Sequence, residues 1–269
     1  MGFAHLEVEN EGPVATVWLN RPAKHNALSA DMWTDLPVVM RQLGDDPGVR
    51  VVVVAGRGPS FTVGIDLEML AAIAPQGSSE ADRRLHLLRT VKELQGTMSA
   101  LADCPKPVIA AVHGFCLGAG LDLITACDIR LAATDAVFGV RETRMGLVAD
   151  VGTLQRLPRI IPPGDVAELV YTGADFGADR AATIGLVNRV FPDIDGLLRG
   201  AAGLAAEIAA NSPLVVQGAK AVLRAGEGRS VQEGLDYVAV WNSAFLISDD
   251  LSEAMAAFAE RRPPDYKGR

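Results

Sequence analysis

The chain has 269 residues, of which 49% are hydrophobic and 5% aromatic, and its formal net charge is −8. A chain of this length can bury a large globular core, built here mainly from aliphatic side chains. The negative net charge and the scattered basic residues argue against a nucleic-acid partner. No apolar run reaches the roughly 18 to 20 residues that a membrane span needs, so no membrane segment is expected.

The compartment is predicted from the N-terminal segment and the cysteines. The segment MGFAHLEVENEG is acidic and lacks the basic and then apolar pattern of a signal peptide. Cys104, Cys116 and Cys127 form no C-x-x-C pair and have no histidine nearby at ligand spacing. We therefore expect reduced core thiols, no metal site and a cytoplasmic protein.

The first part of the chain alternates between predicted strands and predicted helices. Strands are expected at 3–8, 14–19, 51–55 and 108–112, and helices at 29–43, 66–73, 80–102 and 118–127. Twice, a buried strand leads through a glycine-containing loop into a helix, which indicates a repeated structural unit. The pattern predicts an α/β core over residues 1–195.

After Asp150 the pattern is helical for most of the remaining chain, and no strand is expected beyond about residue 195. Ser212-Pro213 predicts a helix start, and Ser230 with Glu233 and Asp250 with Glu253 have the spacing of capping boxes. We expect residues 196–269 to form a helical region that packs on its own core or on a neighbouring subunit.

Two glycine turns, Gly56-Arg57-Gly58 and Gly118-Ala119-Gly120, fail the G-x-G-x-x-G pattern because a larger side chain stands where the third glycine belongs. A dinucleotide site is therefore not expected. Backbone N–H groups at helix starts are unpaired, and two of them can form an oxyanion hole. Ile65 and Ala119 are the candidate donors, and ordinary strand-to-helix turns are the alternative.

Three acids follow the second turn at fixed offsets: Asp122, Glu142 twenty residues later and Asp150 eight further. Acids in apolar, glycine-rich surroundings are costly to bury unless they are paired or used chemically. Each acid also has a structural interpretation. Asp122 can be a charge favoured by the helix dipole, Glu142 can pair with its flanking arginines, and Asp150 can be the N-cap of the following helix.

FTVGIDL and HGFCLGAGLDLITACDIR resemble the crotonase (enoyl-CoA hydratase/isomerase) superfamily, and the resemblance runs from LNRPAKHNAL to RRPPDYKGR. LDLITACDIR, RETRMGL and ADVGTLQRLP resemble its dienoyl-CoA isomerase branch, which converts 3,5-dienoyl-CoA to 2,4-dienoyl-CoA in fatty acid β-oxidation. The resemblance implies a crotonase-like spiral of repeated ββα units. It also implies a C-terminal helical region for trimerisation, with trimers that can pair into hexamers.

The resemblance further implies a mechanism. The amides of Ile65 and Ala119 would hold the thioester carbonyl, although the second position is more often glycine in the family. Glu142 and Asp150 would move protons, with Glu142 assigned to C2 and Asp150 to C6 by analogy. Asp122 would orient the site; hydratases carry glutamate there, and the shorter aspartate counts against an ordinary hydratase.

For the CoA moiety the resemblance implies contacts from the 23–24 and 63–67 loops and the second glycine turn. The expected residues are Ala23, Lys24, Val63, Gly64, Asp66, Leu67 and Gly118. Lys24 and Arg57 are candidates for phosphate contacts, although a lone lysine is often only solvated. CoA belongs to the substrate, so no separate cofactor is expected. The alternatives are an enoyl-CoA hydratase and a non-catalytic acyl-CoA-binding member of the fold.

Overall fold

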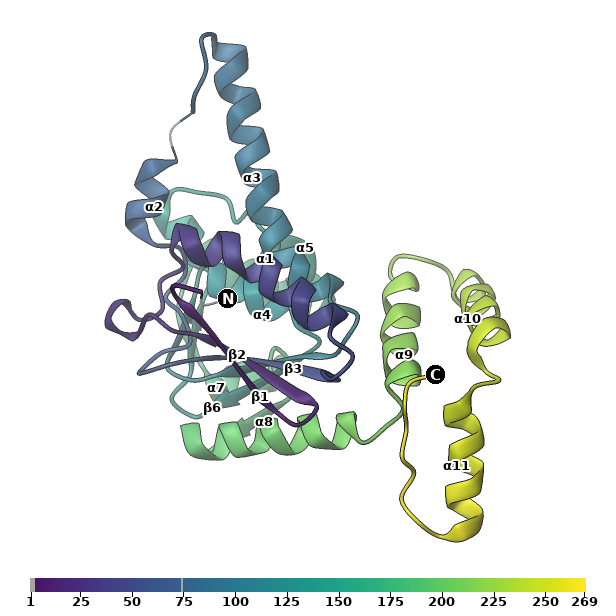
Figure 1. Cartoon of the computed structure of the whole chain (residues 1–269). Helices are drawn as coiled ribbons and strands as arrows, with labels where there is room; N and C mark the ends of the chain where they lie inside the picture. Colours follow the sequence, from purple (N-terminus) through teal and green to yellow (C-terminus); the bar gives the residue numbers. More distant parts are fainter. Residues whose placement is uncertain (1–2, 74) are drawn as a thin grey trace.

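The computed structural model describes residues 3–73 and 75–269 (Figure 1). The strands are β1 (Leu6–Glu11), β2 (Val14–Leu19), β3 (Val51–Gly56), β4 (Val108–Val112), β5 (Phe115–Leu117), β6 (Ile129–Ala133), β7 (Val137–Gly139), β8 (Phe176–Gly177) and β9 (Arg189–Phe191). The α-helices are α1 (Ala30–Asp45), α2 (Leu67–Ala72), α3 (Glu80–Asp103), α4 (Ala119–Ala126), α5 (Thr153–Arg156), α6 (Pro163–Thr172), α7 (Ala178–Thr183), α8 (Ile194–Ala209), α9 (Pro213–Ala225), α10 (Val231–Phe245) and α11 (Asp249–Glu260). Within the described ranges, no helix is both long enough and apolar enough to span a membrane.

The larger sheet has the strand order β1-β2-β3-β4-β6-β9, and a smaller sheet has the order β5-β7-β8. β1 and β2 form an antiparallel hairpin, with Glu11 opposite Val14. The other neighbours in the larger sheet run parallel. Parallel strands need crossover connections, which are commonly helical. The predicted α/β class is therefore confirmed.

The β-branched run of β3 is covered on both faces of the sheet. Val52 and Val54 belong to the main core, which also contains side chains of α1, α3 and α4. Val51 and Val53 belong to a second core, which the small residues of α8 complete. Strands buried on both faces are expected to be continuously apolar, and this explains the sequence of 51–55.

The expectation that no strand lies beyond about residue 195 is confirmed within the described residues, but the mostly helical pattern after Asp150 hides two short strands before that point. β8 pairs with β7, and β9 pairs with β6 at the edge of the larger sheet. These strands have two and three residues, which is too short for an alternating pattern to emerge. Their pairing is set by the sheets that they join.

Helix α3 is only partly buried. Thr97, Met98 and Leu101, near its C-terminal end, are buried, whereas Leu85 and Leu88 are exposed. The N-terminal half of α3 extends beyond the body of the protein, with α2 opposite (Figure 1). The apolar residues of this half therefore have a role other than filling the core.

The C-terminal region begins with a helix that packs on the core. α8 lies across the larger sheet, whereas α9, α10 and α11 stand to one side of it (Figure 1). The predicted helix starts at Ser212 and Ser230 are confirmed, and Ser230 forms a capping box with Glu233. The predicted boundary near residue 195 stays a prediction.

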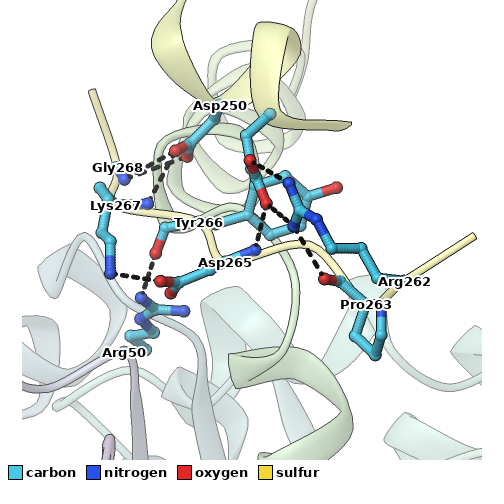
Figure 2. Close-up of polar contacts among 9 residues, drawn as sticks. Arg50, Asp250, Arg262, Pro263, Asp265, Tyr266, Lys267 and Gly268 are labelled. Atoms are coloured by element: carbon cyan, nitrogen blue, oxygen red, sulfur yellow. Dashed lines mark hydrogen bonds and ion pairs between the residues drawn. The ribbon is translucent and has the colours of Figure 1, made fainter. Parts of the chain in front are cut away.

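The predicted capping box at Asp250 is wrong, because Ser248 is the N-cap of α11. Asp250 is instead buried and accepts hydrogen bonds from the Lys267 and Gly268 amides at 2.8 and 3.0 Å (Figure 2). The hydroxyl of Ser212 donates to the same carboxylate at 2.5 Å. One carboxylate thus joins the start of α9, the first turn of α11 and the C-terminal tail.

Arg50 ties the same tail to the core. Its guanidinium donates to the Tyr266 carbonyl at 2.6 Å (Figure 2) and to the Ala209 carbonyl at 2.9 Å. Glu253, on α11, accepts from Arg262 and from the Asp265 amide. The tail therefore holds the C-terminal helices in a defined position relative to the sheet.

We expect Asp250→Ala to lower the free energy of unfolding by about 2 to 3 kcal/mol, because it leaves two amides and a buried hydroxyl without an acceptor. Urea denaturation monitored by circular dichroism measures the change. Asp249→Ala is the matched control: this exposed neighbour contacts Arg269 at 3.4 Å and should cost less than about 1 kcal/mol. Equal losses in the two variants would contradict the role given to Asp250.

Candidate active site

A cavity of about 500 Å³ lies between α2, α3, the start of α4 and the 141–151 segment. It brings together most of the site residues predicted from the sequence. The predicted residues in its wall are Val63, Gly64, Ile65, Leu67, Gly118, Ala119, Asp122, Glu142 and Asp150. The three acids, distant in sequence, therefore face one volume.

Gly64 allows two backbone segments on one side of the cavity to meet. Gly64 has φ +93°, and a Cβ there would lie 2.7 Å from the Leu117 carbonyl oxygen and 3.3 Å from the Ala119 nitrogen. Only glycine fits so close a contact at that dihedral. Within residues 3–73 and 75–269, neither the Ile65 nor the Ala119 amide has a hydrogen-bond acceptor. Two free N–H donors thus belong to adjoining parts of the cavity wall.

Asp122 lies in the first turn of α4, a helix whose residues are all buried. Its Oδ1 accepts a hydrogen bond from the Thr153 amide at 2.5 Å, while its Oδ2 is buried with no partner among the described residues. Burial raises the pKa of this carboxyl to about 6, against an ordinary 3.8. The position of Asp122 in the first turn of α4 fits the helix-dipole interpretation, but this interpretation does not explain its hydrogen bond to the Thr153 amide.

Glu142 begins a 3-10 turn, Glu142–Met145. Its Oε1 lies next to Gly118, where a Cβ would approach it to 3.3 Å, and its Oε2 is buried without a partner in the described part of the chain. Burial, followed by the charge of Asp122, raises its pKa to about 7 from 4.5. The alternative interpretation, an ion pair with a flanking arginine, is wrong within the described residues: Arg141 pairs with Asp175, and Arg144 donates to the Thr172 carbonyl.

Asp150 lies in a segment without helix or strand and remains partly exposed. The interpretation of Asp150 as an N-cap is wrong, because Gly152 is the N-cap of α5 and no side chain caps this helix. The backbone carbonyl of Asp150 accepts a hydrogen bond from Gln95 Nε2 at 2.7 Å. Partial burial raises the pKa of the Asp150 carboxyl above its ordinary value.

The remaining residues predicted to contact CoA lie outside the cavity wall. Asp66 caps α2 by accepting from the Glu68 amide at 2.8 Å, and it pairs with Arg21. Lys24 Nζ lies 3.7 Å from Glu68 Oε1, and both side chains are largely exposed. Ala23 precedes Lys24 in the same 3-10 turn. Their contacts with CoA stay predictions.

Arg57 is engaged elsewhere. It pairs with Glu7 and Glu9 and stacks on Trp18, with its guanidinium carbon 3.8 Å from the ring centroid. The side chain is therefore bound to side chains of the hairpin β1–β2. A phosphate contact at this position would have to compete with two carboxylates.

Several residues in the cavity wall were not predicted as site residues. They come from α1, α3 and the 145–148 segment: Trp33, Leu87, Thr90, Val91, Leu94, Met145, Leu147 and Val148. The signal for those on α3 was the helical spacing of its leucines, which the sequence alone assigns to a packed core. The structure instead uses this face to line the cavity.

Comparisons with known proteins give one consistent result. The profile of the family described as enoyl-CoA hydratase/isomerase matches residues 9–269. The peroxisomal Delta(3,5)-Delta(2,4)-dienoyl-CoA isomerase of Arabidopsis thaliana is 45% identical over 98% of this chain and 97% of that protein. The mitochondrial enzyme of the same name from Rattus norvegicus is 44% identical over 93% of this chain and 77% of that protein. The crystal structure of an enoyl-CoA hydratase from Bacillus anthracis superimposes with a TM-score of 0.89 at 34% identity, covering 98% of this chain and all of that one.

We expect the unfolding free energy to fall as the pH rises from 4.5 to 7, because folded Glu142 keeps its proton up to about pH 7 whereas the unfolded chain loses it near its ordinary pKa. Glu142→Gln should reduce the change in unfolding free energy over this pH range by at most about 3 kcal/mol. Urea titrations at pH 4.5, 6 and 8 measure the slope.

The control for this measurement is Glu93→Gln, which neutralises an exposed carboxylate on α3. It should keep the slope of the unsubstituted chain. A slope in Glu142→Gln equal to that of the control would contradict the buried, proton-holding state assigned to Glu142.

Proposed function

The chain belongs to the enoyl-CoA hydratase/isomerase family and is an enzyme of that family, and on that premise we propose that it converts 3,5-dienoyl-CoA to 2,4-dienoyl-CoA. The observation that carries the proposal is the convergence of Asp122, Glu142 and Asp150 on one cavity. It is supported by relatives that are 45% and 44% identical and are named for this isomerisation. An acyl-CoA thioester is the substrate class of the family.

The first element of the proposed mechanism is charge stabilisation. The thioester carbonyl oxygen accepts hydrogen bonds from the Ile65 and Ala119 amides, whose N–H groups have no other acceptor among the described residues. When a proton leaves C2, negative charge moves onto this oxygen, and fixed donors stabilise it. Alanine at the second position serves as well as glycine because the donor is the backbone.

The proton transfers balance without another reactant. A base takes the C2 proton, and the C–H electron pair becomes the C2=C3 double bond. The C3=C4 electrons become C4=C5, and the C5=C6 electrons take a proton at C6 from an acid. The net change is one proton lost at C2 and one gained at C6.

We assign Glu142 to C2 and Asp150 to C6. Glu142 Oε1 lies beside Gly118, the residue before Ala119, and C2 is bonded to the carbonyl carbon whose oxygen would accept from the Ala119 amide. A base with a pKa of about 7 is partly ionised at neutral pH and still strong enough to take a proton. Asp150 lines the same cavity, and a bound apolar chain would exclude water from its carboxyl and favour the protonated form.

Asp122 is the feature that favours isomerisation over hydration. Its Oδ1 is engaged by the Thr153 amide and its carboxyl is fully buried. The Thr153 amide fixes the orientation of this carboxyl, and only Oδ2 remains without a partner among the described residues. We therefore give Asp122 an orienting role and keep hydration of 2-enoyl-CoA as the competing activity to be measured.

The proposal extends to assembly. Helices α10 and α11 expose large apolar side chains, among them Val231 at 82% and Phe258 at 87%. Burial of such side chains against a second subunit would be favourable, so we propose a homotrimer or a pair of trimers. A role in fatty acid β-oxidation and a cytoplasmic location are proposed with it; the names of the plant and rat relatives place those proteins in the peroxisome and the mitochondrion.

We expect Asp150→Asn to lower kcat for 3,5-dienoyl-CoA isomerisation at least about 100-fold while the fold is retained, because the amide cannot deliver the C6 proton. The ultraviolet absorbance of the conjugated 2,4-diene follows the reaction, and circular dichroism checks the fold. Asp135→Asn, an exposed aspartate in the turn between β6 and β7, is the control and should keep full turnover.

Two outcomes would contradict the proposed function. One is an unsubstituted protein that produces no 2,4-diene absorbance but adds water rapidly to a 2-enoyl-CoA, which would make it a hydratase. The other is tight binding of CoA thioesters without turnover of any of them, which would make it a binding protein. Near-full activity of Asp150→Asn would remove Asp150 from the mechanism.

A further inference from the structure

Asp150 is not held in place by a helix or a strand. Residues 147–150 form neither helix nor strand, so the carboxyl depends on a few contacts to stay at one distance from a substrate. We propose that Gln95 is a positioning residue for Asp150, and that helix α3 sets the placement of the C6 acid through it. This inference rests on the proposed function, because it assigns a task to Asp150 in that reaction.

Gln95 acts directly on the backbone of Asp150. Its side-chain amide donates to the Asp150 carbonyl at 2.7 Å. One turn later on α3, the Ser99 hydroxyl accepts from Arg156 of α5 at 3.1 Å. On the other side of the segment, the Thr153 amide is held by Asp122. The segment from Asp150 to Arg156 is therefore fixed between α3 and α4.

Helix α3 also forms the wall past which a bound chain would run. Val91 and Leu94 line the same cavity as Asp150, and Leu94 directly precedes Gln95. Because a helix moves as a rigid unit over one turn, contact of an acyl chain with Leu94 and placement of Asp150 are coupled. Displacement of a catalytic group by about 1 Å can lower the reaction rate about 100-fold. Loss of the single hydrogen bond between Gln95 and Asp150 can therefore have a large effect on the rate.

Loss of the Gln95 donor should leave the fold intact. Gln95 and Asp150 are both exposed to solvent, so water can replace the amide at the carbonyl. The effect should fall on the proton transfer at C6 and not on the one at C2, because Glu142 is held separately in its 3-10 turn beside Gly118. A general loss of structure would reduce both transfers together.

The test measures the two transfers separately in D₂O. The substrate is 3,5-dienoyl-CoA, and mass spectrometry follows the exchange of deuterium into C2 of the unreacted substrate alongside product formation. In Gln95→Leu we expect isomerisation to fall at least about tenfold, with little change in KM, while C2 exchange persists. The ratio of exchange to isomerisation should therefore rise at least about tenfold. Gln95→Glu, which keeps the size but replaces the donor by an acceptor, should show the same change.

Gln155→Leu is the matched control, since Gln155 lies on α5, is exposed and makes no side-chain hydrogen bond within the described residues. Its ratio should equal that of the unsubstituted enzyme. An unchanged ratio in Gln95→Leu, or equal loss of exchange and isomerisation, would overturn the role of Gln95 while leaving the proposed function standing. Absence of isomerisation in the unsubstituted protein would overturn the proposed function and this inference with it.

Discussion

The hydrogen bond from the Thr153 amide to the buried Asp122 carboxylate is the contact on which the candidate active site depends. It joins α4, which begins with Ala119, to α5 and the segment that carries Asp150. A carboxylate buried in an apolar helix is costly, and the raised pKa of about 6 shows how strongly burial opposes its charge. The amide donor offsets part of this cost and fixes the two helices relative to each other.

The cavity also contains polar atoms that the protein leaves unpaired. Within the described ranges, buried atoms without a partner include Trp33 Nε1, Asp122 Oδ2 and Glu142 Oε2, and all three residues line the cavity. Unpaired buried groups are rare because each costs free energy. Their concentration around one volume is typical of a site that a ligand completes. Burial in this wall, followed by the charge of Asp122, is also what raises the pKa of Glu142 to about 7.

The sequence predicted the parts of this protein that depend on local pattern. The buried strands β3 and β4, the glycine turns and the capped starts of α9 and α10 were recognisable from composition and spacing. The crotonase-like α/β fold with C-terminal helices is confirmed by the structure and by its similarity to solved structures of the family. The roles of Asp122, Glu142 and Asp150 stay predictions, now placed around one cavity.

Features that depend on distant contacts were not predictable. β8 and β9 are too short to show a period. The buried role of Asp250 depends on Lys267 and Gly268 in the C-terminal tail, so the local spacing with Glu253 does not reveal it. Leu87 and Leu94 of α3 have core spacing but line a cavity, since the opposing wall comes from other parts of the chain. The hydrogen bond of Gln95 to Asp150 spans 55 positions and leaves no local signal.

In the proposed mechanism two carboxylates exchange separate protons with the substrate, Glu142 at C2 and Asp150 at C6. The most direct measurement is the position of deuterium in 2,4-dienoyl-CoA formed from 3,5-dienoyl-CoA in D₂O. The two-carboxylate account predicts one deuterium at C6, delivered by an acid that has equilibrated with solvent. A product that carries the original C2 proton at C6 would mean that one group moves a single proton along the chain, and it would contradict the account.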